Sequence, residues 1–345
     1  MFCLLSQPSM ATIREVSEVA QVSSATVSRV VNGNKWVSTA TRDRVLAAMA
    51  ELGYQPNSFA RALATNRSET IGMVVGDLAG SFFGGMMHSA EQEVRKAGKH
   101  LIITSGHDSI ESERDAIDFL LQRRVDALIL HLDVMSDEDL IALNAKVQVP
   151  IVLVNRRVPE LAGRCVSLDN ELGGYLATQH LLELGHRAIA CITGPLYKAD
   201  ARARLAGYRR ALEQANCDYD EHLVIESNFT ESGGQAAAAR LLSRQIPFTA
   251  LFAQNDHLAI GAMNQLKTQQ LRIPGDISLV GYDDMVMAPY VEPALTTVAI
   301  PVNEFGRQSA LLALNLTGPP DVQITHRFKP TLVLRDSTAR AVKTL

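Results

Sequence analysis

The first 55 residues of the chain carry three short apolar stripes with helical spacing. Thr12 and Glu15 fit a capping box that opens the first helix. Ser23 is a good N-cap for a second helix over residues 24–32, and Ser38 caps a third. The stripes are Val16, Val19 and Ala20; Val27, Val30 and Val31; and Val45, Met49 and Leu52. Three short helices joined by tight turns predict a small bundle that contains a helix-turn-helix unit.

From residue 69 onwards, continuous apolar runs alternate with amphipathic stretches. The runs of strand length cover 70–76, 101–105, 126–130, 150–154, 188–192, 249–252 and 277–281. The helical patterns between them include 112–123, 171–185, 201–215, 231–244 and 257–270. Uninterrupted apolar strands separated by helices predict parallel sheets covered on both faces. Because the strands are too many for one compact sheet, we expect an α/β core of two parallel-sheet subdomains behind a small all-α head.

Length and composition fit this organisation. The 345 residues suggest roughly two domains at about 150 residues each, and 47% hydrophobic with 20% charged residues are typical of globular proteins. Apolar runs such as 71–75 are far shorter than the ~20 residues of a membrane helix. The 4 cysteines include no Cys-x-x-Cys pair and favour a reducing compartment, the cytoplasm. Residues 1–9 are expected to be an extension outside the fold.

The charge distribution favours a nucleic-acid partner for the head. The net charge is −4, but basic residues outnumber acidic ones between residues 10 and 70. In a helix-turn-helix unit the N-terminal residues of the second helix reach base edges in the major groove. Here these are Ser24, Ala25 and Thr26, with Ser28 and Arg29 one turn further on. An arginine can bind guanine through two hydrogen bonds, although Arg29 could also be a solvated surface residue.

Three segments resemble the LacI/GalR family of bacterial transcriptional regulators: Ala-Thr-Ile-Arg-Glu-Val at 11–16, Val-Ser-Ser-Ala-Thr-Val-Ser-Arg-Val-Val-Asn at 22–32 and Gly-Tyr-Gln-Pro-Asn-Ser-Phe-Ala-Arg-Ala-Leu-Ala at 53–64. The resemblance implies a DNA-binding domain over 10–56 and a hinge helix and linker over 57–68. It also implies that the Leu63 side chain enters a minor-groove base step. The DNA-binding residues expected on this basis are Thr12, Ser23, Ser24, Ala25, Thr26, Ser28, Arg29, Asn32, Ser38, Tyr54, Asn57, Ala60 and Leu63.

For the core over 69–340 the resemblance implies a periplasmic-binding-protein-like fold with a ligand in the cleft between subdomains. The first subdomain is expected at 69–168 plus 297–325, and the second at 169–296 plus 326–340. Ligands of open α/β sheets bind beyond the carboxyl ends of the strands. The effector-binding residues expected from the resemblance are Arg204, Asp283, Asn255, Asn155, Phe82, Phe83 and Phe229. Guanidinium, carboxylate and amide groups suit vicinal hydroxyls, and aromatic rings suit the C–H face of a sugar.

Other interpretations of these polar residues stay open. Arg204 could instead pair with Asp283 across an empty cleft, and Arg202 could be a simple surface charge. Asp256 is expected to be a helix N-terminal carboxylate rather than a ligand contact. His186 follows a helix end and is expected at the surface or as a cap. No Walker A loop, G-x-S-x-G elbow or H-E-x-x-H motif occurs, so we expect no enzyme activity, no catalytic residue, no metal site and no cofactor.

The resemblance implies a repressor that binds a palindromic DNA operator as a homodimer and releases it when a small sugar binds. Galactose or a galactoside is favoured as the effector, with a β-glucoside, a pentose such as ribose, or a purine co-repressor as alternatives. A transporter's sugar-binding protein would lack the DNA-binding head, and a nucleotide-dependent α/β enzyme would need a phosphate-binding loop. No membrane partner is expected.

Overall fold

The computed structural model describes residues 11–31, 36–54, 68–78, 81–319 and 322–341. The chain divides into two compact units, Met1–Ser68 and Glu69–Leu345, and each is described by itself. The expected extension at 1–9 lies outside the described residues, as do Asn32, Asn57, Ala60 and Leu63.

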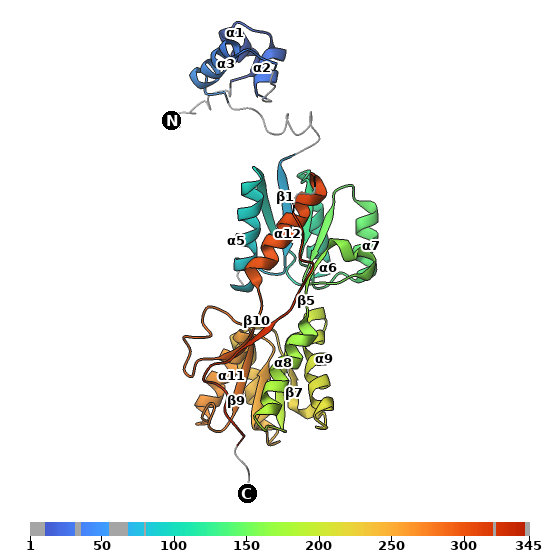
Figure 1. The fold of residues 1–345 in the computed structure, drawn as a ribbon, viewed down its shortest axis with the longest axis vertical. Coiled ribbons are helices and arrows are strands. Elements are labelled where there is room, and N and C mark those ends of the chain that lie inside the picture. Colours follow the sequence, from blue (N-terminus) through green and yellow to red (C-terminus); the bar gives the residue numbers. More distant parts are fainter. Residues whose placement is uncertain (1–10, 32–35, 55–67, 79–80, 320–321, 342–345) are drawn as a thin grey trace, which may run out of the picture. The chain divides into compact units, whose positions relative to one another are not determined.

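The described residues of the first unit form three helices: α1 (Ile13–Val19), α2 (Ser24–Val31) and α3 (Thr39–Glu51) (Figure 1). Each begins where the sequence predicted a cap. Thr12 and Glu15 form the complete capping box of α1. The Ser23 hydroxyl accepts a hydrogen bond from the Thr26 N–H at 3.1 Å, and Ser38 accepts one from the Thr41 N–H at 3.3 Å. Local sequence therefore defines all three helix starts.

The core of this unit consists of short aliphatic side chains. The buried set is Val16, Ala20, Val27, Val30, Val45 and Ala48, with Val31, Met49, Leu52 and Tyr54 packed around it. The prediction that Val19 belongs to the core is wrong, because its side chain is 45% exposed. Val16 and Ala20 are four positions apart and face the other helices, whereas Val19 lies at the margin of that face.

The second unit contains two six-stranded sheets. The first has the order β11-β5-β4-β3-β1-β2, and every pairing in it is parallel. Its strands are β1 (Thr70–Val75), β2 (His100–Ser105), β3 (Ala127–Leu130), β4 (Ile151–Val154), β5 (Cys165–Leu168) and β11 (Arg327–Phe328). The second sheet has the order β12-β10-β9-β8-β6-β7, with β12 antiparallel to β10 and the other pairs parallel. Its strands are β6 (Ile189–Thr193), β7 (Val224–Glu226), β8 (Ala250–Ala253), β9 (Ser278–Asp283), β10 (Thr296–Ala299) and β12 (Thr331–Val333).

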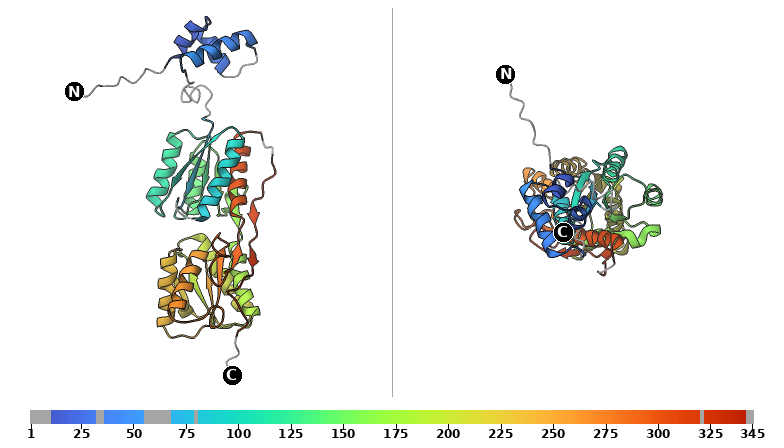
Figure 2. Two further views of the ribbon diagram at one scale, coloured as in Figure 1. Left: turned by 90° about the vertical axis from the view of Figure 1, so that its left-hand side faces the viewer. Right: turned by 90° about the horizontal axis from the view of Figure 1, so that it is seen from above.

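Helices cover both faces of each sheet, as Figure 2 shows. The first sheet lies between α5 (Ser81–Lys96) with α12 (Val302–Thr317) and α6 (Ile110–Gln122) with α7 (Asp137–Lys146). The second lies between α8 (Asn170–Glu183) with α9 (Ala199–Gln214) and α10 (Glu231–Ser243) with α11 (Asp256–Thr268). Within β1, Met73 and Val75 pack on the α5 side and Val74 on the opposite side. Both faces need apolar residues, which explains the uninterrupted apolar runs.

The chain crosses between the two subdomains three times. It passes from β5 into α8 near residue 169, returns to the first sheet after β10, and crosses again between β11 and β12 (Figure 1). The second and third crossings lie near 300 and 329, a few residues later than the sequence-based boundaries at 297 and 326. The difference arises because β10 pairs with β9 and β11 pairs with β5.

Several short strands have no counterpart among the runs predicted from sequence. They are β5, β7, β10, β11 and β12, none of which exceeds four residues. Short segments such as Arg327–Phe328 carry too little periodicity to be recognised, and only their neighbours in the sheet define them. No helix of the described residues is long and apolar enough to cross a membrane.

Candidate functional site

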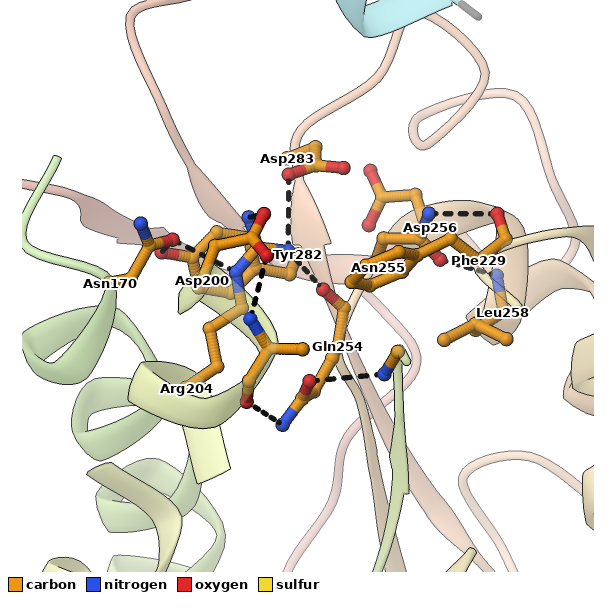
Figure 3. A network of polar contacts seen from close by, with 12 residues as sticks. Asn170, Asp200, Arg204, Phe229, Gln254, Asn255, Asp256, Leu258, Tyr282 and Asp283 are labelled. Carbon is orange, nitrogen blue, oxygen red and sulfur yellow. Dashed lines mark hydrogen bonds and ion pairs between the residues drawn. The ribbon is translucent and has the colours of Figure 1, made fainter. Parts of the chain in front are cut away.

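The polar centre of the second subdomain is Arg204, on the second turn of α9. Its side chain is buried, with a relative exposure of 3%. The Nε atom donates a hydrogen bond to the Asn170 Oδ1 at 3.0 Å, and Nη1 donates to the carbonyl of Gln254 (Figure 3). The guanidinium carbon lies 3.8 Å from the centre of the Tyr282 ring. Hydrogen bonds and ring stacking therefore fix the guanidinium in one orientation.

Tyr282 and Asn170 complete the support of this arginine. Tyr282 is fully buried in β9, and its hydroxyl donates to the Asn170 Oδ1 at 3.3 Å. Asn170 is the first residue of α8, which packs closely against α9. A Cβ atom on Gly174 would lie 2.0 Å from the Arg204 carbonyl oxygen, so only glycine permits this helix contact. The two helices thus hold Arg204 at the carboxyl edge of the second sheet.

Asp283 ends β9 and faces the Arg204 guanidinium. Its Oδ1 lies 3.8 Å from Nη1 of Arg204, which is ion-pair distance but too long for a hydrogen bond. That oxygen has no hydrogen-bond partner among the described residues. Burial raises the pKa of Asp283 to about 8, and the nearby Arg204 charge offsets only part of this shift. Because α9 and β9 belong to one subdomain, the pair does not bridge the cleft, contrary to the alternative that the sequence left open.

Asn155 connects this network to the first subdomain. It follows β4 with a φ of 57°, and its Oδ1 accepts a hydrogen bond from the Asn170 Nδ2 at 3.1 Å. Its Nδ2 donates to the Asp200 Oδ2 at 3.5 Å, and the same carboxylate lies 3.5 Å from Arg204. Asn155 and Arg204 therefore belong to one polar network that spans both subdomains.

Phe229 and Asn255 lie on the other side of Arg204 (Figure 3). The Phe229 ring is 5.7 Å from the guanidinium carbon and packs over Gly194, where a Cβ atom would collide with it. Asn255 is the N-cap of α11, and its Oδ1 accepts from the Leu258 N–H while its Nδ2 donates to the Phe229 carbonyl. Both polar atoms of Asn255 therefore make structural hydrogen bonds, which position the aromatic residue.

Asp256 lies at the start of its helix, as expected, but its carboxylate bonds to segments outside that helix. It begins α11 and is fully buried. Its carboxylate accepts hydrogen bonds from the Thr297 hydroxyl at 2.6 Å and from the Met285 N–H at 2.8 Å. Burial raises the pKa of Asp256 to about 6, against the effect of these hydrogen bonds. Asp256 therefore ties the segment that follows β9 to β10.

Phe82 and Phe83 form a separate cluster at the carboxyl edge of the first sheet. Their ring centroids are 5.1 Å apart, and the centroid of the His131 ring lies 6.0 Å from Phe82 and 5.1 Å from Phe83. Within the described part of the chain, no ring contact joins this cluster directly to Arg204.

Lys198 reaches from the second subdomain to this edge of the first sheet. Its ammonium lies 2.8 Å from the Asp108 carboxylate and 3.0 Å from that of Asp133. The loop that carries Asp133 is held by Glu113, whose buried carboxylate accepts hydrogen bonds from the N–H groups of residues 133, 134 and 135. Lys198 thus binds two loops of the first subdomain from across the boundary between the subdomains.

A cavity of about 260 Å³ lies between the subdomains, beside Asn155 and Asp200. From the first subdomain it is lined by Asn155, Arg156 and Arg157, and from the second by Asn170, Asp200 and Arg202 among others. Arg202 is exposed and donates hydrogen bonds to the carbonyls of Leu196 and Tyr197, as expected of a surface residue.

The head presents a small polar surface at the start of α2. Ser23, Ser24 and Ala25 are exposed, as is Arg29 one turn later. Thr26 and Ser28 are half-buried, because Val27 between them faces the core. Thr12 and Ser38 are helix caps, and Tyr54 packs against the bundle. The first turn of α2 is therefore open to a partner, while the cap residues also have structural roles.

Sequence reasoning missed several residues of the site. Asn170, Asp200, Gln254 and Tyr282 surround Arg204, and His131 and Lys198 lie at the edge of the first sheet. Asp200 precedes Arg204 by one helical turn and Tyr282 adjoins Asp283, so the helix period and chain adjacency could have indicated both. Nothing in the local sequence marks the others.

The arrangement is suited to binding rather than catalysis. A fixed guanidinium, a carboxylate with one oxygen that has no hydrogen-bond partner among the described residues, and aromatic rings can hold a polyhydroxylated ligand. Among the residues that the structure describes, no group of His, Cys, Asp and Glu is placed to hold a metal ion.

Comparisons with known proteins agree with this architecture. Residues 12–57 match the family described as bacterial regulatory proteins, lacI family, and residues 178–338 match the periplasmic binding protein-like domain. The chain is 42% identical over 337 residues to the HTH-type transcriptional regulator GalR of Salmonella typhimurium, which covers 97% of this chain and 98% of that protein. It is 36% identical over 331 residues to the ribose operon repressor of Haemophilus influenzae, with coverage of 95% and 98%.

Solved structures show the same similarity. The lac repressor dimer bound to operator and the anti-inducer ONPF matches with a TM-score of 0.86 and 32% identity, over 96% of this chain and 99% of that chain. The relatives are transcriptional regulators, in accordance with the absence of a catalytic motif in the sequence. The head, the two parallel-sheet subdomains and the identity along nearly the whole chain show that the protein belongs to the lacI family of bacterial regulatory proteins.

Proposed function

We propose that this regulator is a cytoplasmic repressor, which binds a palindromic operator as a homodimer and releases it when a small sugar binds beside Arg204 and Asp283. The observation that carries the proposal is the state of the Asp283 carboxylate. Its Oδ1 atom is buried beside a fixed guanidinium and has no hydrogen-bond partner among the described residues. Such a group is costly unless a ligand uses it, and two neighbouring sugar hydroxyls suit a carboxylate and a guanidinium together.

The remaining effector contacts follow from the same geometry. Phe229 covers the Arg204 side of the site, and Phe82 and Phe83 offer aromatic surface from the first subdomain. Asn155 reaches the network through Asn170 and Asp200. We assign Asn255 an indirect role, because both its polar atoms hold Leu258 and Phe229. The 42% identity to a regulator named GalR favours galactose or a galactoside as the effector.

Operator binding is assigned to the head over 10–56 and to the linker over 57–68. The exposed residues at the start of α2, with Arg29 one turn later, read base edges in the major groove. Thr12, Tyr54 and the caps Ser23 and Ser38 contact or position the DNA backbone. A single head reads one half-site, so a palindromic operator calls for a two-fold symmetric dimer.

Effector binding is coupled to DNA release through the subdomain boundary. Asn155 and Lys198 both make contacts across it, so a ligand there favours one relative orientation of the subdomains. Such a ligand shifts the equilibrium only by its difference in affinity for the two orientations, typically 1–3 kcal/mol. Induction results when the favoured orientation is the one that binds operator less well.

Isothermal titration calorimetry with the full chain tests the effector assignment. We would titrate D-galactose, D-glucose, D-ribose, cellobiose and hypoxanthine into the wild type, Asp283→Asn and the control Asp276→Asn, an exposed aspartate of the same subdomain. Saturable binding of one sugar, lost in Asp283→Asn and retained in Asp276→Asn, is the expected result. Binding of hypoxanthine alone would indicate a purine co-repressor instead.

Fluorescence anisotropy tests the DNA assignment. Duplexes selected from a random pool by the full chain supply the operator, and the sugar identified by calorimetry is added to the complex. We expect a palindromic consensus and release on addition of sugar. Tighter binding in the presence of the ligand would reverse the proposed direction of control.

A further inference from the structure

His131 is a buried polar residue that the proposed site does not yet use. It directly follows β3, and its N–H donates to the Val74 carbonyl at 2.9 Å, which fixes its backbone at the carboxyl edge of the first sheet. Its relative exposure is 5%, and neither ring nitrogen has a hydrogen-bond partner among the described residues. Buried polar atoms are nearly always paired, so two unpaired nitrogens in one ring need a functional explanation.

The surroundings of the imidazole leave no protein group to satisfy it. The edges of Phe82 and Phe83 pack against the ring. The carboxylate of Asp133, two residues further along the chain, is paired with Lys198 and does not bond to the imidazole. The two aromatic rings pack beside the imidazole but offer its nitrogens no acceptor or donor.

The neighbouring backbone at Gly76 allows close packing at this edge. Gly76 follows β1, and a Cβ atom there would lie 3.2 Å from both the Phe83 Cζ and the Asp133 Oδ2. Any larger residue would press on the aromatic cluster and on the carboxylate. Gly76 therefore lets Phe83 and the Asp133 carboxylate pack closely against the backbone, and Phe83 is the ring that also packs on His131.

The same edge adjoins the second subdomain. Lys198 reaches Asp133, two residues after His131, and the helix that carries Arg204 begins directly after Lys198. Arg204 and Asp283 would therefore hold a ligand from the second subdomain, and His131 would face that ligand from the edge of the first sheet.

We propose that His131 is a specificity-determining residue, which binds a hydroxyl group of the sugar effector from the first subdomain. This inference rests on the proposed function. A hydroxyl both donates and accepts a hydrogen bond, so it can pair with either type of imidazole nitrogen. A site built to bind a hydroxyl discriminates against an analogue that lacks it, since the buried nitrogen is then left unpaired.

The test combines His131 variants with deoxy sugars. The wild type, His131→Phe and His131→Asn are titrated with D-galactose and its 2-, 3-, 4- and 6-deoxy analogues, or with the deoxy analogues of whichever sugar the wild type binds. Phenylalanine fits an aromatic cluster but has no polar atom, while asparagine retains a donor and an acceptor. His88→Phe, at an exposed histidine of α5, is the control. Thermal unfolding followed by circular dichroism verifies that each variant folds.

We expect His131→Phe to bind the parent sugar about tenfold more weakly than the wild type does. One deoxy analogue should bind the wild type equally weakly and show no further loss with His131→Phe. His131→Asn should recover most of the affinity. Should His131→Phe fail to fold, His131→Leu, which also lacks a polar side-chain atom, replaces it in the same titrations with the same expected results.

Unchanged affinity of His131→Phe would overturn the inference while leaving the proposed function intact. A uniform loss for the parent sugar and every deoxy analogue would also overturn it, because the ring would then act through shape alone. If the wild type binds no sugar, the proposed function fails, and this inference fails with it.

Discussion

The ionisation of Asp283 leads to a prediction about the pH dependence of folding. Burial raises the pKa of this carboxyl to about 8 in the folded chain, from 3.8 in the unfolded chain. Between these values the folded state retains a proton that the unfolded state releases. Stability must therefore fall as the pH rises through this window, which is the opposite of the behaviour of an aspartate stabilised by a salt bridge.

The size of the effect follows from the displacement of the pKa. Each unit corresponds to about 1.4 kcal/mol of free energy. Between pH 5 and pH 8 the Asp283 contribution to the free energy of unfolding should fall by about 3–4 kcal/mol, and the slope should level off above pH 8. Asp283→Asn removes the titrating group while retaining a similar shape. Asparagine also tolerates the positive φ of 106° at this position better than most residues do.

Urea unfolding of the wild type, Asp283→Asn and Asp276→Asn at pH 5, 6, 7 and 8, followed by circular dichroism, measures this difference. Asp276 is a suitable control because hydrogen bonds from Arg272 lower its pKa to about 2, so it does not titrate in this range. We expect stability to fall with pH in the wild type and in Asp276→Asn, but much less in Asp283→Asn. A difference in slope below about 0.3 kcal/mol per pH unit between the wild type and Asp283→Asn would refute the reasoning.

Four further substitutions test the contacts that build the site and the head. Lys198→Met should lower stability by about 3 kcal/mol, because it leaves the buried Asp133 carboxylate without its cation; a loss below about 1 kcal/mol in urea unfolding would contradict this. Glu113→Ala should cost about 3 kcal/mol, because three N–H groups lose their acceptor; amide hydrogen exchange should increase at residues 133–135, and unchanged exchange there would contradict this. Gly207→Ala should lower the thermal midpoint by several degrees, since its Cβ would lie 2.0 Å from the Glu171 carbonyl, whereas Ala206→Ser on the exposed side of α9 should not. Thr12→Ala should destabilise the head by about 1 kcal/mol through loss of the capping box, and unchanged protease resistance of the head would exclude this.

Sequence pattern was most informative where structure depends on neighbours along the chain. The caps at Thr12, Ser23 and Ser38 and the longer strands such as β1 and β9 could all be predicted, because capping and strand burial leave regular local signals. The pattern was less reliable at the margin of a buried helix face. Val19 fits the apolar stripe by spacing yet is exposed, because it lies at the margin of the face that Val16 and Ala20 bury.

Histidines illustrate what sequence left undecided. His186 was expected at the surface or as a cap, but it is buried, with its ring hydrogen-bonded to the hydroxyls of Thr249 and Ser278 and to the Ala339 carbonyl. His131 is similarly buried, but its ring nitrogens have no hydrogen-bond partner among the described residues. The two residues have the same chemistry, and only the packing around them distinguishes a structural histidine from a candidate for ligand binding.

The sequence by itself determined the class of the protein: a helix-turn-helix head, an α/β core of two parallel sheets, and Arg204 and Asp283 as candidate effector residues. Tertiary structure alone decided how these residues work. It brought Asn170 and Tyr282 against Arg204 from segments 34 and 78 residues away, placed Asp283 beside the guanidinium in the same subdomain, and left one of its oxygens unpaired. The physical reason is that periodicity and capping depend on residues within a few positions, whereas burial, ion pairing and pKa depend on groups that only the folded chain brings together.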